Sequence, residues 1–179
     1  MKSHEFTIIA SGFDPDTDDF VNRLFKHGCD DATVSFQKGV TILSFDREAA
    51  TFSSAIISAL QAVVAAGGRV ERIEPDHLVS LADIADRSGM TRAAITNYHK
   101  GDRASGFPAP VARVTSSSSL WDWYEVAEWL CRNGRLDRKE VIRARIVKEA
   151  NLYVETAHEL VIDNFVERLE NAEKQLAAA

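Results

Sequence analysis

The first 75 residues alternate between short apolar runs and longer segments in which apolar residues recur every three or four positions. β-Branched and aromatic runs predict strands, and the three-to-four spacing predicts helices. The strands are expected at 6–11, 32–36, 40–45 and 69–73, and the helices at 15–28 and 52–64. This β-α-β-β-α-β order is typical of a ferredoxin-like module over residues 1–75, in which two helices cover one face of a sheet.

Turn signals separate these elements. Gln37-Lys38-Gly39 lies between the two central strands and predicts a hairpin. Gly67-Gly68 follows the second helix and ends it. The first helix is expected to bury one apolar face, and the residues on that face are Phe20, Val21, Leu24 and Phe25.

The acidic run at residues 13–20 resembles the start of a calcium-binding loop, with a carboxylate at every second position from Asp14 to Asp18. The remaining positions do not fit, because Asp19 stands where the loop needs glycine and Phe25 where it needs glutamate. The run therefore predicts an acidic first turn of the helix at 15–28, and no metal site.

After Pro75 the pattern changes to that of a helix-turn-helix over residues 81–98. Gly89 falls at the tight turn, where a left-handed residue is needed, and Thr91 can cap the second helix. Met90 fills the corner between the helices. The residues expected to face inward are Ile84, Ala85, Ile95 and Tyr98.

The outer face of the second helix carries side chains that suit DNA. Arginine matches guanine and asparagine matches adenine in a bidentate way, so Arg92 and Asn97 are candidate base contacts. The helix N-terminus and nearby cations suit phosphates. The candidate DNA-binding residues here are Thr91, Arg92, Ala93, Thr96, Asn97, Lys100 and Arg103.

A Gly-Phe-Pro-x-Pro step, a short hairpin and a closing helix follow, at residues 106–133. Asp122 begins the closing helix and has capping-box spacing with Glu125. The residues that carry a resemblance are Phe107, Pro108, Pro110, Trp121, Val126, Trp129 and Leu130. With them, residues 78–132 resemble the winged helix-turn-helix module of excisionase- and AlpA-like proteins, relatives of the MerR regulators.

The resemblance implies double-stranded DNA binding, with the second helix in the major groove and the hairpin tip, Thr115 to Ser119, as a wing along the backbone. Arg113 and Ser117 are the candidate wing contacts. Such wings often carry several Arg or Lys, whereas this tip is a run of serines, so a plain flexible turn is the alternative. The run around residues 28–49 also resembles a group of uncharacterised bacterial DNA-binding proteins, which supplies no activity.

The C-terminal segment, residues 135–179, contains no glycine or proline and predicts one long helix or a helical hairpin. Its apolar stripe is too extensive to stand alone, so it packs on a partner chain or folds back. We expect it to serve dimerisation. The stripe comprises Val154, Ala157, Leu160, Val161, Phe165, Leu169, Ala172 and Leu176.

Charge is distributed unevenly along the chain. The 179 residues carry a net charge of -6, but residues 79–115 hold five Lys and Arg against three Asp and Glu, and form a net-positive segment. Screening confines the electric field of each charge to about 8–10 Å, so the whole-chain charge says little about this segment.

The 45% hydrophobic content indicates a folded globule. The sequence contains no apolar run long enough to span a membrane.

Other chemistries find little support. The five histidines lack metal-ligand spacing, the two cysteines are far apart, and no nucleophile or phosphate-loop motif occurs. The pattern favours a reduced cytoplasmic setting and a protein that is neither an enzyme nor dependent on a cofactor. Trp121, Trp123, Tyr124 and Trp129 could stack on single-stranded bases, but their spacing favours a core beneath the wing.

The leading interpretation is a sequence-specific transcriptional regulator that binds double-stranded DNA as a dimer, held together by the N-terminal module or the C-terminal helix. The alternative is an antitoxin-type or adaptor protein, which captures a partner protein with either of those parts and binds its own promoter. A third hypothesis, a ligand-sensing module similar to ACT domains at the N-terminus, has no identifiable pocket residue.

Overall fold

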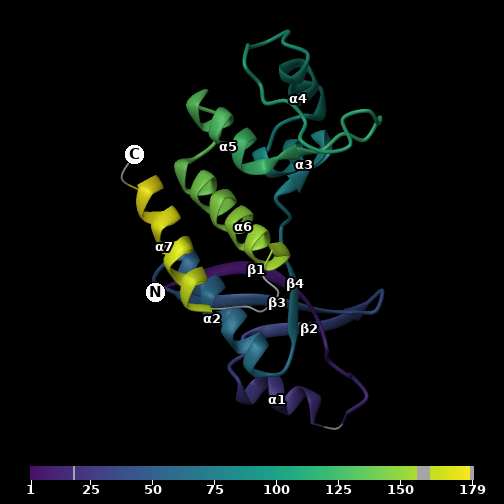
Figure 1. Cartoon of the computed structure of the whole chain (residues 1–179). Helices are drawn as coiled ribbons and strands as arrows, with labels where there is room; N and C mark the ends of the chain where they lie inside the picture. The colour runs from purple at the N-terminus through teal and green to yellow at the C-terminus, as the bar shows by residue number, and fades with distance from the viewer. Residues whose placement is uncertain (18, 157–161, 178–179) are drawn as a thin grey trace. The chain divides into compact units, whose positions relative to one another are not determined.

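The computed structural model describes residues 1–17, 19–156 and 162–177. These residues form a mixed α+β structure with a four-stranded antiparallel sheet and seven helices (Figure 1). The chain divides into two compact units, residues 76–148, termed the central unit, and residues 1–75 together with 149–179, termed the α/β unit. Helix α6 (Arg138–Thr156) begins in the central unit and ends in the α/β unit. The segment expected at 135–179 is therefore shared between the two units.

The sheet of the α/β unit has the strand order β2-β3-β1-β4, and each neighbouring pair is antiparallel. The strands are β1 (Lys2–Ser11), β2 (Ala32–Gln37), β3 (Val40–Ala49) and β4 (Arg69–Glu74). Alternate apolar residues of β1 and β3 are buried on one face, where Phe52 of α2 packs on Phe6 and Phe20 of α1 packs on Phe36. The strand expected at 6–11 extends four residues further toward the N-terminus.

The predicted hairpin between β2 and β3 is present, and its turn consists of Lys38 and Gly39 only, because Gln37 belongs to β2. Lys38 and Gly39 both have positive φ, 53° and 80°, which is the geometry of a type I′ turn. Gln37 then pairs directly with Val40. This turn fixes the register of the whole hairpin.

Helix α2 (Phe52–Ala65) is capped at its start and buried along one side. Thr51 accepts a hydrogen bond from the backbone N–H of Ser54, whose side chain in turn accepts from the N–H of Thr51, a reciprocal capping box. The helix ends before Gly67-Gly68, as expected from the sequence.

Helix α1 (Phe20–Lys26) is shorter than the helix expected at 15–28, and the expected acidic first turn is absent. Asp14 accepts a hydrogen bond from the N–H of Asp16 at 3.0 Å, and this local turn competes with the helix. Phe20 and Leu24 are buried, whereas Val21 and Phe25 are 70% and 68% exposed. The expected four-residue apolar face is therefore wrong for two of its members, because a helix of two turns covers only a narrow strip of sheet.

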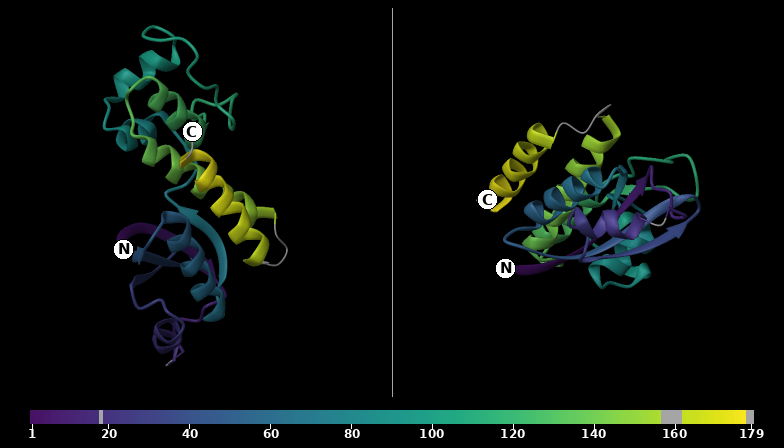
Figure 2. Two further views of the ribbon diagram at one scale, coloured as in Figure 1. Left: turned by 90° about the vertical axis from the view of Figure 1, so that its left-hand side faces the viewer. Right: turned by 90° about the horizontal axis from the view of Figure 1, so that it is seen from below.

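Helix α7 (Ile162–Ala177) folds back onto the α/β unit and lies beside α2 (Figures 1 and 2). Phe165, Leu169 and Ala172 of the predicted stripe are buried there. The hydroxyl of Ser53 donates to Glu173, which joins the two helices. The stripe thus follows the fold-back alternative for these three residues, while Ala157, Leu160 and Val161 lie outside the described residues.

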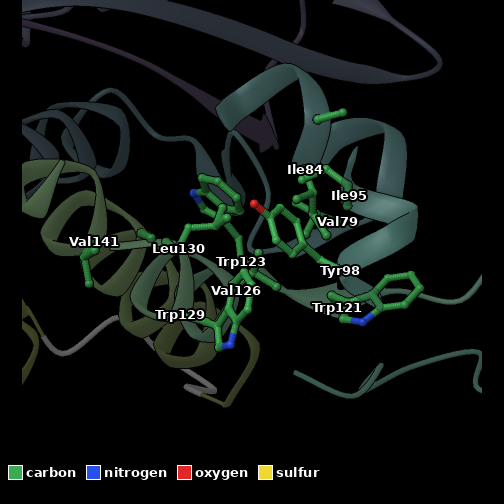
Figure 3. Packing of buried hydrophobic residues seen from close by; sticks show 13 residues of the cluster. Val79, Ile84, Ile95, Tyr98, Trp121, Trp123, Val126, Trp129, Leu130 and Val141 are labelled. Atoms are coloured by element: carbon green, nitrogen blue, oxygen red, sulfur yellow. The ribbon is translucent and has the colours of Figure 1, made fainter. Parts of the chain in front are cut away.

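The central unit contains α3 (Leu81–Ser88), α4 (Arg92–His99), α5 (Trp123–Arg132) and the first part of α6, with a short antiparallel pair, β5 (Leu78–Val79) and β6 (Trp121–Asp122). Its core is one cluster of apolar and aromatic side chains, in which Trp121, Trp123 and Trp129 are buried (Figure 3). The prediction of a tryptophan core is therefore confirmed. Because these faces are buried, they do not form a stacking platform for single-stranded bases.

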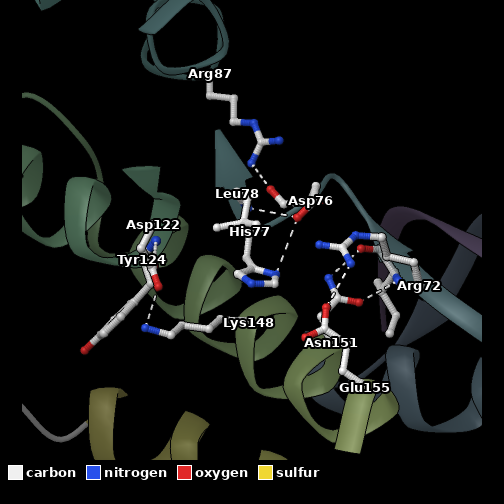
Figure 4. A network of polar contacts seen from close by, with 11 residues as sticks. Arg72, Asp76, His77, Leu78, Arg87, Asp122, Tyr124, Lys148, Asn151 and Glu155 are labelled. Atoms are coloured by element: carbon white, nitrogen blue, oxygen red, sulfur yellow. Dashed lines mark hydrogen bonds and ion pairs between the residues drawn. The ribbon is translucent and has the colours of Figure 1, made fainter. Parts of the chain in front are cut away.

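Asp122 and Lys148 join α5 to α6 within the central unit (Figure 4). Asp122 is buried and caps α5, accepting hydrogen bonds from the N–H groups of Tyr124 and Glu125. Lys148 Nζ lies 2.5 Å from its carboxylate, and the Lys148 side chain is 23% exposed. The buried carboxylate therefore has two backbone donors and one cation.

We expect Lys148→Met to lower the free energy of unfolding by about 1–3 kcal/mol, because it leaves the buried Asp122 carboxylate without its cation. The matched control is Lys139→Met on the same helix, whose side chain is 73% exposed and lies 3.7 Å from Asp137. The control should change stability by less than about 0.5 kcal/mol. Urea denaturation of both variants measures the difference, and equal midpoints would contradict a structural role for the buried pair.

Candidate nucleic-acid interface

The two helices of the predicted helix-turn-helix begin at well-defined caps. Ser80 accepts from the N–H of Asp83 at 3.2 Å, and Asp83 accepts from the N–H of Ser80 at 2.8 Å. Hydrogen bonds from the Ser80 hydroxyl and N–H hold the pKa of the Asp83 carboxyl below its usual range. Gly89 ends α3 with φ of 65°, so the glycine stands at a left-handed position as the sequence predicts.

Helix α4 presents one face to the core and the other to solvent. Thr91 caps it by accepting from the N–H of Ala94 at 3.2 Å. Ile95 and Tyr98 are buried, and Tyr98 meets the indole of Trp129 edge to face at 5.1 Å. The burial of these two side chains fixes which side of α4 is turned outward.

The predicted site residues of α4 lie on this outward side. Arg92, Ala93 and Lys100 are exposed, while Thr96 and Asn97 are half-buried. The Thr96 hydroxyl donates to the carbonyl of Arg92 at 2.9 Å, so it is partly engaged within the helix. The structure therefore brings the candidate base contacts, Arg92 and Asn97, together on one helix.

Two indoles fasten the loop that follows α4. Trp129 Nε1 donates to the carbonyl of Ser105 at 3.3 Å, and Trp121 Nε1 donates to that of Pro108 at 3.1 Å. Phe107 packs edge to face on Trp129 at 5.1 Å. The Phe-Pro-x-Pro step is thus held by the core, and the exposed Arg103 lies within the loop before it.

The expected wing hairpin is reduced to a single antiparallel bridge between Ala112 and Leu120. Arg113 follows the bridge with φ of 50°, a left-handed conformation that is uncommon for residues other than glycine. Its carbonyl accepts from the N–H of Ser116 at 2.9 Å and from the hydroxyl of Ser116 at 3.0 Å. The chain leaves the extended conformation at Arg113, and Ala112–Leu120 remains an isolated bridge in this part of the structure.

The serine hydroxyls at the tip bond mainly to the tip itself. Ser116 Oγ accepts from the N–H of Ser118 at 3.1 Å, and Ser119 Oγ lies 3.2 Å from the carbonyl of Ser116. Ser117 is exposed, and its hydroxyl makes no hydrogen bond within the described part of the chain. Short hydroxyl side chains therefore build the turn, at positions where the wings of the resembled family often carry basic residues.

The outward face of α4 and the two loops that follow it carry four cations, namely Arg92, Lys100, Arg103 and Arg113. All four are exposed, and none has an ion-pair partner among the residues that the structure describes. Arg87 differs, because it donates to the carbonyl of Asp76 at 2.7 Å (Figure 4). Its guanidinium also lies over the ring of Trp123. The four surface cations are thus available to an anionic partner, whereas Arg87 serves the fold.

Sequence reasoning missed two features of the central unit. His99, at the end of α4, is exposed and packs edge to face on Trp121 of β6 at 5.1 Å. Residues 132–148 hold seven Lys and Arg against two Asp and Glu. Acidic residues further along the chain offset this basic segment, so the net charge of the whole chain does not reveal it.

Other kinds of site find no support in the described residues. No group of His, Cys, Asp and Glu side chains there could hold a metal ion. Burial raises the pKa of the Cys29 thiol to about 11, which disfavours the reactive thiolate. None of the helices described is both long and apolar enough to cross a membrane.

Comparison with known proteins gives no match, since neither a protein-family model, nor a curated protein, nor a solved structure is significantly similar to this chain.

The backbone conformation at Arg113 gives a direct prediction for stability. Arg113→Gly places a residue without a Cβ at φ of 50° and should raise the free energy of unfolding relative to Arg113→Ala by up to about 1 kcal/mol. Both variants remove the same charge, so the difference reports on the backbone alone. Urea denaturation of the two proteins tests this, and a less stable glycine variant would show that Arg113 does not hold this conformation in solution.

Proposed function

We propose that the protein is a sequence-specific transcriptional regulator that binds double-stranded DNA as a dimer, with α4 in the major groove. The observation that carries the proposal is the outward face of α4, where Arg92 and Asn97 stand on a helix whose other face is buried. Their side chains match the hydrogen-bonding edges of guanine and adenine. The proposal includes a cytoplasmic location and no enzymatic activity.

We further propose that the central unit is a winged helix-turn-helix of the excisionase- and AlpA-like kind. Helices α3 and α4 joined at Gly89, the bridge between Ala112 and Leu120, and the closing helix α5 support this assignment. The α/β unit is proposed to be ferredoxin-like. Its β-α-β-β-α-β order and its strand order β2-β3-β1-β4 support that assignment.

The wing region is proposed to contact the phosphate backbone. Arg113 and the exposed Ser117 supply a cation and a hydroxyl, while Lys100 and Arg103 supply cations beyond the end of α4. Phosphate contacts of this kind position a protein on DNA without reading sequence. Since only a few such contacts are available, base contacts and a second half-site must supply much of the affinity.

An antitoxin-type or adaptor role is the second candidate, and it would use another surface. Phe165, Leu169 and Ala172 of the C-terminal stripe are buried within the α/β unit, so these side chains are not free to bind a partner protein. The exposed Val21 and Phe25 of α1 are the feature that favours a protein partner. A different polypeptide that co-purifies with the chain in fixed stoichiometry would support the adaptor role.

The base-reading residues can be tested by single substitutions. Arg92→Ala and Asn97→Ala should each weaken binding to the preferred duplex by about 1–3 kcal/mol, if each makes a bidentate base contact. Lys26→Ala, which removes an exposed cation from α1, is the control and should leave the affinity nearly unchanged. Titration at one fixed salt concentration measures all three, and wild-type affinity of both α4 variants would show that α4 does not read DNA.

The wing should contribute to affinity and not to sequence choice. Arg113→Gly should weaken binding to all duplexes by a similar factor and lower the slope of affinity against salt by about 1, the loss of one phosphate contact. Titrations of a preferred and an unrelated duplex at several salt concentrations measure this. A changed preferred sequence, found by selection from a random pool, would contradict a phosphate-only role.

A further inference from the structure

The two edge strands of the sheet in the α/β unit, β4 and β2, differ in whether their outward backbone groups have hydrogen-bond partners. At the β4 edge the N–H of Ile73 donates to Oδ1 of Asn151 at 2.7 Å, and Nδ2 of Asn151 donates to the carbonyl of Ile73 at 2.9 Å. Arg72 also pairs with Glu155 at 2.9 Å (Figure 4). Asn151 is buried and pairs with Ile73 as a residue of another strand would, so the protein's own α6 covers this edge at Ile73.

The β2 edge has no such cover. In a two-residue hairpin the residues that flank the turn, Gln37 and Val40, form a hydrogen-bonded pair. Along an antiparallel ladder, hydrogen-bonded pairs then alternate with pairs that exchange no hydrogen bond. The N–H and C=O groups of Val34 and Phe36 therefore point away from β3. Within the described part of the chain none of these four groups has a hydrogen-bond partner.

The β2 edge also lacks the features that usually prevent strands from pairing. Its sequence, ATVSFQ, contains no charge and no proline, whereas β4 reads RVERIE. Phe36 is 47% exposed and packs on Phe20 of α1 at 5.4 Å. Val21 and Phe25 of the same helix are exposed. An uncharged strand edge thus lies next to a helix that carries apolar surface.

We propose that this edge pairs with the β2 strand of a second copy of the chain, antiparallel about a two-fold axis at Ser35. In this register Val34 lies opposite Phe36 of the second copy, and Phe36 lies opposite its Val34. All four outward backbone groups of each strand are then satisfied. The two sheets become one continuous sheet of eight strands, and the apolar side chains of Val34 and Phe36 pack across the junction.

The charges at the ends of β2 favour a second copy in this orientation. Asp30 precedes the strand and Lys38 follows it, and both are exposed. Antiparallel pairing places Lys38 of one copy near Asp30 of the other, while parallel pairing would place like charges together. The strand is therefore complementary to itself, which is what an isologous interface requires.

This inference deepens the proposed function, because it names the surface that joins the two copies. Its geometry does not depend on DNA, so the two proposals can fail separately. A two-fold axis through β2 would give the dimer the symmetry of a palindromic operator with two half-sites.

The register can be tested by disulfide formation. Ser35→Cys, in a Cys131→Ser background, places two thiols opposite each other in a pair without hydrogen bonds, where Cα atoms are about 4.5 Å apart and a disulfide can form. Thr33→Cys is the matched control, since Thr33 is exposed on the same strand face but would lie about 13 Å along the strand from its equivalent. The remaining Cys29 is buried.

Under mild oxidation without DNA, Ser35→Cys should form a covalent dimer at least about tenfold faster than Thr33→Cys. Equal rates would overturn the proposed register.

A second pair of variants tests whether the edge holds the dimer. Ser35→Lys brings two ammonium groups face to face at the axis, whereas Thr33→Lys places each lysine opposite Gln37 of the second copy. By sedimentation at micromolar concentration, wild type and Thr33→Lys should be dimers and Ser35→Lys a monomer, with circular dichroism confirming that each is folded.

A wild-type mass near the 19.8 kDa of one chain, or a Ser35→Lys variant that remains dimeric, would overturn the inference. The effect of Arg92→Ala on DNA binding is measured independently of the oligomeric state. Failure of the proposed dimer surface is therefore distinguishable from failure of the proposed function.

Discussion

The packing of Tyr98 and Ile95 against the core of the central unit is the interaction on which the proposed interface depends. A helix of eight residues is too short to be stable alone, so α4 exists because its inner face is buried. The edge-to-face contact between Tyr98 and Trp129 adds about 0.5–1.5 kcal/mol beyond the area buried. The same Trp129 holds the loop after α4 through Ser105, so one indole contacts both the helix and the loop that follows it.

A net charge of -6 is compatible with this interface because charge is distributed unevenly along the chain. The four exposed cations around α4 and the wing have no acidic partner within the described residues, and screening limits the reach of acids elsewhere to about 8–10 Å. A small number of phosphate contacts gives weak non-specific binding. Specificity would then rest on Arg92 and Asn97, and affinity on the presence of two copies.

The sequence predicted the features that depend on local geometry. The turn at Lys38 and Gly39, the left-handed Gly89, the cap at Thr91 and the buried tryptophans were all expected, since each follows from a residue type with one strong preference. The features that it missed depend on local hydrogen bonds that compete with helix or hairpin formation, or on contacts between residues far apart in the sequence. A turn at Asp14 shortens α1, and the serines of the wing bond to one another. The docking of α7 on α2 brings together Ser53 and Glu173, which are 120 positions apart, and periodicity does not reveal such a contact.

The most direct test of the central claim is a map of amide chemical shifts on titration with a duplex selected from a random pool. If α4 reads DNA, one sequence is enriched, and the largest shifts fall in residues 91–103 and 113–119. Failure of any sequence to be enriched, or shifts confined to residues 1–75, would contradict α4 as the element that reads DNA.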